Sequence, residues 1–247
     1  MRYLLAAVVG RNCTRKAECG NAWVPPITLL PSGYPTDRWH FGVYDETTEK
    51  GRFRLGYVIH PGVSPEPPYS NEVHINSSLE LMLKAYNVFN HRFPGAWAVF
   101  SSYAWDLCRL FTYFPNMPEG QWWLQYKRNF SRAATILSHA TARKLELVAD
   151  YGCRRSPTFN PPAKWTSAMN LSFCSGELHM GVSREARAAQ IVNSIGQQAN
   201  LTTINFEKLI RGRITNSLLN QGYYLHPTKA TSIYLWNVWL NTQRTTA

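Results

Sequence analysis

The chain has 247 residues, of which 45 % are hydrophobic and 13 % aromatic. This length can bury a sizeable core, and the hydrophobic content excludes wholesale disorder, which needs low hydrophobicity and high charge. Lys and Arg outnumber Asp and Glu by 26 to 15, which predicts anionic partners. Charged residues nevertheless make up only 17 % of the chain, fewer than is typical of a protein that mainly neutralises phosphates.

The cysteines are odd in number and irregular in spacing, and no Cys-x-x-Cys motif occurs. They are Cys13, Cys19, Cys108, Cys153 and Cys174. This pattern argues against a disulfide scaffold or a structural zinc site and favours reduced thiols, with a Cys13–Cys19 bridge as the open alternative.

The first residues have two interpretations. Met1 and Arg2 precede an apolar run over 3–9 that resembles a short signal-peptide core, and sequons at Asn12, Asn76, Asn129, Asn170 and Asn200 would suit secretion. The chain is rich in Asn, Ser and Thr, however, so several sequons are expected by chance. Basic residues around the apolar run, ahead of the first acid at Glu18, fit an uncleaved mitochondrial leader. We therefore predict a mitochondrial protein, on the matrix side or associated with the inner membrane, with secretion as the alternative.

The N-terminal third predicts a β-hairpin between proline-rich segments. Prolines and glycine over 20–37 predict an extended arm, anchored by Trp23 and Tyr34, and residues 61–71 form a second proline-rich connection. Between them, apolar and polar residues alternate over 38–60 on both sides of a polar turn at Asp45–Gly51, as in an antiparallel hairpin.

From Ser77 onward the hydrophobic period is helical. A capping box at Ser77–Glu80 starts a helix that ends at Pro94. The next predicted helix, over 97–114, places Trp97 and Phe100 on its apolar face. Its opposite, polar face carries Ser102, Asp106 and Arg109.

A long helix is predicted from 118 to 149. Its apolar stripe runs from Trp123 through Phe130 to Leu145 and Val148. The nearly opposite face carries a basic row of Arg128, Arg132, His139 and Arg143.

Prolines and a glycine interrupt the helical pattern over 152–176. Helices are then predicted over about 183–199, 203–220 and 228–240. The last is apolar nearly all round, with Trp236 and Trp239, and must be buried in the core or against a partner. No apolar run approaches the roughly 18 residues of a transmembrane helix, so the chain is predicted to have no transmembrane span of its own.

These elements predict an α+β fold that is predominantly helical, in which an N-terminal β-hairpin with proline-rich arms precedes about six amphipathic helices. The predicted divisions are an arm over 1–37, the hairpin and its connection over 38–76, and a helical domain over 77–247 with a break at 152–176.

No catalytic motif is present in the sequence. Phosphate-binding glycine loops, His-Glu-x-x-His and Gly-x-Ser-x-Gly are all absent. Among the histidines, His40, His60 and His74 would converge if the hairpin paired with residues 72–75, but a metal site there would still need carboxylates nearby. The prediction is therefore a protein that is not an enzyme, with no catalytic or metal-ligating residues and no cofactor.

Basic and aromatic residues are the predicted contact points. They are Arg128, Arg132, His139, Arg143, Arg154, Arg155, Lys208, Arg211, Arg213, Trp23, Tyr34, Trp236 and Trp239. We expect a structural accessory subunit of a large mitochondrial assembly, such as a respiratory-chain complex or ATP synthase, whose partners are neighbouring protein subunits and also anionic lipid headgroups or rRNA. The alternative is a mitochondrial ribosomal protein that contacts rRNA. A secreted protein or an enzyme of unrecognised type is the remaining class.

Overall fold

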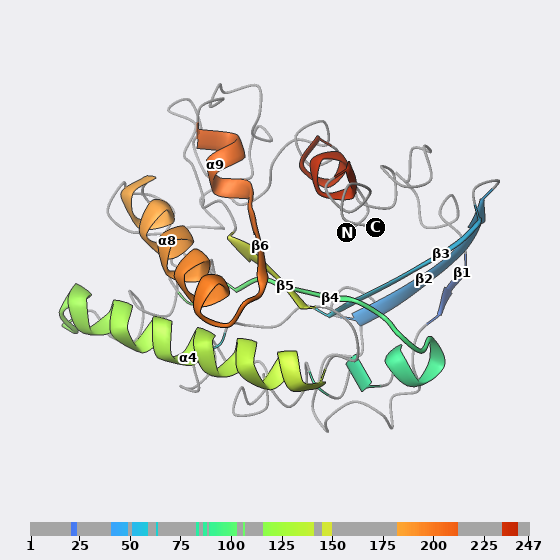
Figure 1. Cartoon of the computed structure of the whole chain (residues 1–247), viewed down its shortest axis with the longest axis horizontal. Coiled ribbons are helices and arrows are strands. Elements are labelled where there is room, and N and C mark those ends of the chain that lie inside the picture. The colour runs from blue at the N-terminus through green and yellow to red at the C-terminus, as the bar shows by residue number, and fades with distance from the viewer. Residues whose placement is uncertain are drawn as a thin grey trace, which may run out of the picture.

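The computed structural model describes residues 21–23, 41–48, 51–58, 63, 83, 86–87, 89–102, 106, 116–140, 145–149, 182–211 and 234–241. Two three-stranded sheets lie within these ranges, and helices cover the second of them (Figure 1). No helix in this part of the chain is long and apolar enough to cross a membrane.

The first sheet is antiparallel and has the order β1-β2-β3, from Asn21–Trp23, Phe41–Thr48 and Gly51–Val58. β2 and β3 are the two arms of the expected hairpin. The polar residues at its tip pair as well, from Asp45 opposite Arg54 to Thr48 opposite Gly51, so the turn is only two residues long. The expected arm also differs, because Asn21–Trp23 pairs with β2 as a strand.

The second sheet is parallel, with the order β4-β5-β6, from Ala98–Phe100, Leu145–Ala149 and Thr202–Asn205. Helix α4 (Glu119–Ala140) connects β4 to β5, and helix α8 (Val182–Gln198) connects β5 to β6. Each pair of strands with its helix is a βαβ unit, the usual way of joining parallel strands. The short helix α9 (Phe206–Arg211) follows β6 directly.

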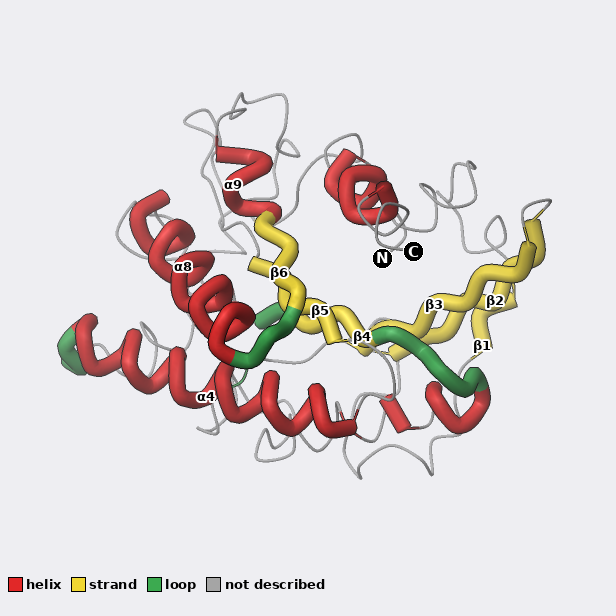
Figure 2. The backbone as a smooth tube through the Cα atoms, viewed as in Figure 1, coloured by secondary structure: helices red, strands yellow, loops and turns green. Residues whose placement is uncertain are grey.

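Helices cover both faces of the parallel sheet, giving three layers (Figure 2). On one face, which we call the α4–α8 face, Phe100, Leu145 and Leu147 pack against the buried sides of the two connecting helices. On the opposite face, Val148 and Ile204 pack with Leu235 of a helix over 234–241. All five residues of β5 are buried as a result, as expected for a parallel strand between two layers of helices.

The prediction of a predominantly helical α+β fold is wrong. The described core is a βαβαβ arrangement, and three segments predicted as helix contain its strands. β4 lies in the helix predicted over 97–114, β5 in the last two turns of the helix predicted over 118–149, and β6 at the start of the one predicted over 203–220. Burial on both faces removes the alternation that would have marked β5, and β4 and β6, with three and four residues, are too short to show one. The predicted domain boundaries at 37, 76 and 152–176 fall outside the described residues.

Helices α4 and α8 are joined at their N-terminal ends by one polar cluster. The Arg184 guanidinium donates to both carboxylate oxygens of Glu119 over 3.2 and 3.3 Å, and the indole of Trp123 donates to the same carboxylate over 2.9 Å. The Arg187 guanidinium lies 5.3 Å from the centroid of Trp123. The Trp123 hydrogen bond and then the Arg184 guanidinium hold the pKa of the Glu119 carboxyl below its usual value.

Helix α8 ends in a Schellman motif, which turns the chain toward β6. Asn200 has a left-handed φ of 54°, the Leu201 amide donates to the Gly196 carbonyl over 2.8 Å, and the Asn200 amide donates to the Gln197 carbonyl over 3.3 Å. This turn brings Gly196 against the start of β6. A Cβ atom at residue 196 would lie 2.1 Å from Thr203 Oγ1 and 3.1 Å from the Leu201 carbonyl oxygen.

We expect Gly196→Ala to lower the free energy of unfolding by about 2 kcal/mol, because the added methyl overlaps a side chain and a backbone oxygen that cannot both move away. Gly120→Ala in the first turn of α4 is the matched control, since a Cβ there meets nothing within 4 Å. This control should raise the stability by up to about 1 kcal/mol, as alanine restricts the unfolded chain. Urea denaturation measures both changes, and equal effects would contradict the close approach of α8 to β6.

Candidate active site

The candidate site lies where the chain leaves the carboxyl end of β4. In open parallel sheets, ligands bind beyond the carboxyl ends of the strands. Ser101 and Ser102 are the first residues after β4, and Asp106 follows four residues later. Ser102 and Asp106 are both buried, with 5 % and 3 % of their surface exposed.

Ser102 and Asp106 form a direct side-chain pair. The Ser102 hydroxyl donates a hydrogen bond to Asp106 Oδ2. The other carboxylate oxygen, Oδ1, accepts from the backbone amide of Val63 over 2.9 Å. Two segments 43 residues apart in the chain therefore meet at this carboxylate, and both of its oxygens are held in fixed directions.

Helix α4 holds the backbone of Ser102 from the other side. The buried Tyr126 hydroxyl donates to the Ser102 carbonyl oxygen over 2.6 Å. Trp122 stacks on the Tyr126 ring, with centroids 5.5 Å apart and planes inclined by 9°. Because Phe130, one turn further along α4, packs on Phe100 of β4 at 4.9 Å, the helix and the strand that carry these contacts form one rigid unit.

We expect Tyr126→Phe to lower the free energy of unfolding by about 1–2 kcal/mol, because the buried Ser102 carbonyl loses a short hydrogen bond while the ring packing is kept. Tyr86→Phe is the control, since its hydroxyl donates to the Ala96 carbonyl over a longer 3.3 Å in a partly buried place. Thermal or urea unfolding of both variants measures the difference. A Tyr86 variant that loses as much as the Tyr126 variant would contradict a special role for the contact with Ser102.

Two other polar side chains lie near the parallel sheet. Asn205, the last residue of β6, accepts a hydrogen bond from the Lys208 amide over 2.8 Å and so caps α9. Glu146 of β5 is fully buried on the opposite face, and its carboxylate accepts a hydrogen bond from the Trp239 indole over 2.6 Å. The first contact starts α9, and the second joins β5 to the helix over 234–241.

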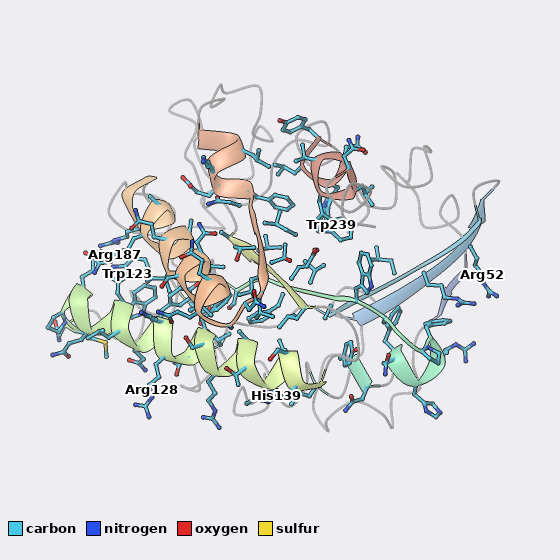
Figure 3. All side chains as sticks on the ribbon, viewed as in Figure 1. Arg52, Trp123, Arg128, His139, Arg187 and Trp239 are labelled. Carbon is cyan, nitrogen blue, oxygen red and sulfur yellow. The ribbon has the colours of Figure 1, made fainter. Side chains whose placement is uncertain are left out.

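The structure does not bring the sequence-predicted contact residues to the Ser102–Asp106 pair. Arg128, Arg132 and His139 lie on the exposed side of α4, and Arg128 and His139 point away from the sheet (Figure 3). Lys208 is exposed on α9, where Arg211 is the last residue. Whether any of these residues binds a partner stays a prediction.

Of the aromatic residues predicted as contact points, two pack against the core, one ends a strand and one lies outside the described residues. Trp236 and Trp239 pack edge to face, 5.6 Å apart, against the core of the opposite face. Trp23 ends β1. Tyr34, Arg143, Arg154, Arg155 and Arg213 lie outside the described residues, as do the five cysteines and the histidine trio of the hairpin. Within the described ranges, no three His, Cys, Asp or Glu side chains gather as metal ligands.

Sequence reasoning missed Ser102 and Asp106 by placing them on the polar face of a surface helix. Both side chains are instead buried and bonded to each other. The available signal was a short apolar run, Ala98–Phe100, followed at once by two serines, with an aspartate four residues after the second, which also fits the end of a buried strand.

No family model matches the chain, and no curated protein sequence matches it. Solved structures do. One is Est24, a carbohydrate acetylesterase from Sinorhizobium meliloti, with 8 % identity, a TM-score of 0.47 and coverage of 76 % of this chain and 74 % of that one. An aryl esterase from M. smegmatis matches with 11 % identity, a TM-score of 0.47 and the same coverage. Axe2, an acetylxylan esterase from Geobacillus stearothermophilus, matches with 11 % identity, a TM-score of 0.42 and coverage of 66 % of this chain and 65 % of that one.

These matches contradict the predicted structural accessory subunit of a mitochondrial assembly and the prediction that the chain is not an enzyme, since the similar structures are esterases. The ribosomal alternative is contradicted by the same matches. At TM-scores below 0.5 the likeness supplies no argument for a particular activity of this chain.

Proposed function

We propose that the chain is a hydrolytic enzyme that cleaves carboxylic esters at the carboxyl end of β4, with Ser102 as the nucleophile and Asp106 as its base. The observation that supports this most directly is the hydrogen bond from the Ser102 hydroxyl to Asp106 Oδ2. A hydroxyl is a weak nucleophile until a neighbouring base takes its proton, and such a pair within hydrogen-bond distance is the arrangement that covalent catalysis requires.

The chemistry follows from the two side chains. The Ser102 oxygen attacks the ester carbonyl carbon while its proton passes to Asp106, and that proton then leaves with the alcohol. The resulting acyl-serine is cleaved by water, which gives its own proton through the same carboxylate and restores the serine. The amide of Val63 and the hydroxyl of Tyr126 keep the carboxylate and the Ser102 backbone fixed, so that this geometry exists before substrate binds.

The test is turnover of p-nitrophenyl acetate by the full chain. Ser102→Ala and Asp106→Asn should each lower kcat by at least about 100-fold, since the first variant lacks the nucleophile and the second lacks the base. Ser138→Ala is the matched control, because this serine lies near the other end of α4, where its hydroxyl donates to the Thr135 carbonyl at an exposed position, and should leave turnover unchanged. Circular dichroism establishes that the variants are folded.

A covalent probe separates catalysis from simple binding. A fluorophosphonate should label the wild-type chain at the peptide that carries Ser102, and the label should be lost in Ser102→Ala. Labelling of a different serine, or turnover that survives Ser102→Ala, would contradict the assignment of the nucleophile. Binding of the acetate ester without any turnover would contradict the enzymatic proposal itself.

A further inference from the structure

The outer face of α4 is a narrow stripe of exposed side chains on a helix whose other side is fully committed to the core. The inner side of α4 packs on the sheet and α8 through residues such as Trp123, Phe130 and Leu137. Directly opposite, six exposed side chains fall on one line along the helix, namely Gln121, Leu124, Arg128, Arg132, Thr135 and His139. We call these six residues the outer stripe.

The outer stripe carries positive charge, and no residue of the stripe itself is acidic. Arg128 and Arg132 are one turn apart, about 6 Å along the helix axis, and His139 follows about 10 Å further on. The single carboxylate of α4, Glu119, lies at its first residue and is bonded to Arg184 of α8. Arg128 and Arg132 are both exposed, and Arg128 points away from the sheet (Figure 3); among the described residues neither makes an ion pair.

An apolar side chain stands beside these cations. Leu124 is 70 % exposed, the most exposed of the large hydrophobic side chains in the described ranges, and lies one turn before Arg128. A sugar-phosphate backbone offers no apolar surface on which a leucine beside the phosphate contacts could be buried. A membrane surface offers both contacts, because its anionic headgroups bind the arginines while the leucine side chain inserts at the boundary between headgroups and acyl chains.

We propose that the outer stripe of α4 docks the protein on an anionic membrane surface, with Arg128 and Arg132 on headgroup phosphates and Leu124 inserted at the apolar boundary. The net charge of +11 would draw the whole chain to the same surface. This proposal does not depend on the proposed esterase activity.

The first test measures sedimentation of the full chain with large phosphatidylcholine vesicles, with and without phosphatidylserine. Wild-type protein should bind only when phosphatidylserine is present, and less as salt is added. Arg128→Gln with Arg132→Gln should weaken binding about 30-fold, which is about 1 kcal/mol per basic residue converted to an affinity ratio. Arg52→Gln with Arg92→Gln removes the same charge from exposed positions outside α4, on β3 and in the helical segment over 89–92, and should weaken binding no more than about twofold.

The second test separates a membrane from a polyanion. Leu124→Ser leaves the charge unchanged and should weaken vesicle binding about tenfold, since the apolar contact is lost. Vesicle binding that is unchanged in the Arg128/Arg132 double variant, or absent in the wild type, would overturn the proposal. So would tighter binding to single-stranded RNA that needs the two arginines but tolerates Leu124→Ser, because that pattern identifies a nucleic acid.

Hydrolysis of p-nitrophenyl acetate in solution should be the same in the double variant as in the wild type, since the outer stripe lies on the side of α4 away from Ser102. The vesicle assay therefore tests only the proposed membrane docking, and the ester assay tests only the proposed esterase activity.

Discussion

Replacement of Phe130 by alanine is expected to lower the free energy of unfolding by about 4 kcal/mol, because it opens a cavity where α4, β4 and the rest of the core meet. The Phe130 side chain has no exposed surface and contacts the rings of Phe100 and Tyr126, with centroids 4.9 and 5.8 Å away. Urea denaturation followed by circular dichroism measures the loss.

Leu124→Ala is the matched control for this cavity. It removes a large apolar side chain from the same helix, at a position that is 70 % exposed, and should change the stability by no more than about 0.5 kcal/mol. If the free energy of unfolding fell no more in the Phe130 variant than in this control, the side of α4 that carries Phe130 would not pack on the parallel sheet.

Replacement of Trp239 by phenylalanine is expected to cost about 2–3 kcal/mol, because a buried charged group that loses a hydrogen bond is strongly penalised. The indole N–H donates over 2.6 Å to the carboxylate of Glu146, which is fully buried. Phenylalanine keeps most of the ring packing but removes this donor. Urea denaturation measures the change.

Trp236→Phe, on the same helix and in contact with the same core, tests whether the effect belongs to the hydrogen bond. Trp236 packs edge to face on Phe206 and Trp239, and its replacement should cost about 1 kcal/mol or less through lost packing alone. If the two variants were equally destabilised, the Glu146 contact would not be the source of the loss.

The elements with one face toward solvent could be predicted from the hydrophobic pattern of the sequence. The hairpin alternates because its strands pair in register from Phe41 to Thr48, and α8 occupies nearly the range its periodicity predicts. The inner and outer sides of α4 also follow the predicted stripes over the length of the helix, from Trp123 and Phe130 inside to Arg128 and Arg132 outside.

The parallel strands could not be recognised in the same way. Leu145 and Val148 continue the helical spacing of α4 by coincidence, yet they belong to β5 and face opposite sides of the sheet. Between them lies Glu146, a fully buried carboxylate of β5. In the structure its carboxylate accepts a hydrogen bond from the distant Trp239, and no local pattern reveals a partner 93 residues away.

The candidate site was hidden for a related reason. Ser102 and Asp106 are spaced as neighbours on a helix surface, but their environment is set by Val63 and Tyr126, which lie far from them in the chain. The strand that precedes them, β4 (Ala98–Phe100), is too short to show the alternation of apolar and polar residues that predicts a strand. Polar residues that directly follow a short apolar run were therefore the single local indication.

The long separation between Glu146 and Trp239 also has a consequence for how the protein is made. A ribosome that adds about 5–20 residues per second needs roughly 5–20 s to travel from β5 to the helix over 234–241. During that interval the nascent chain has β5 without the layer that covers its second face. Until that helix emerges, the carboxylate of Glu146 has no Trp239 indole to bond to, and Val148 has no Leu235 to pack against.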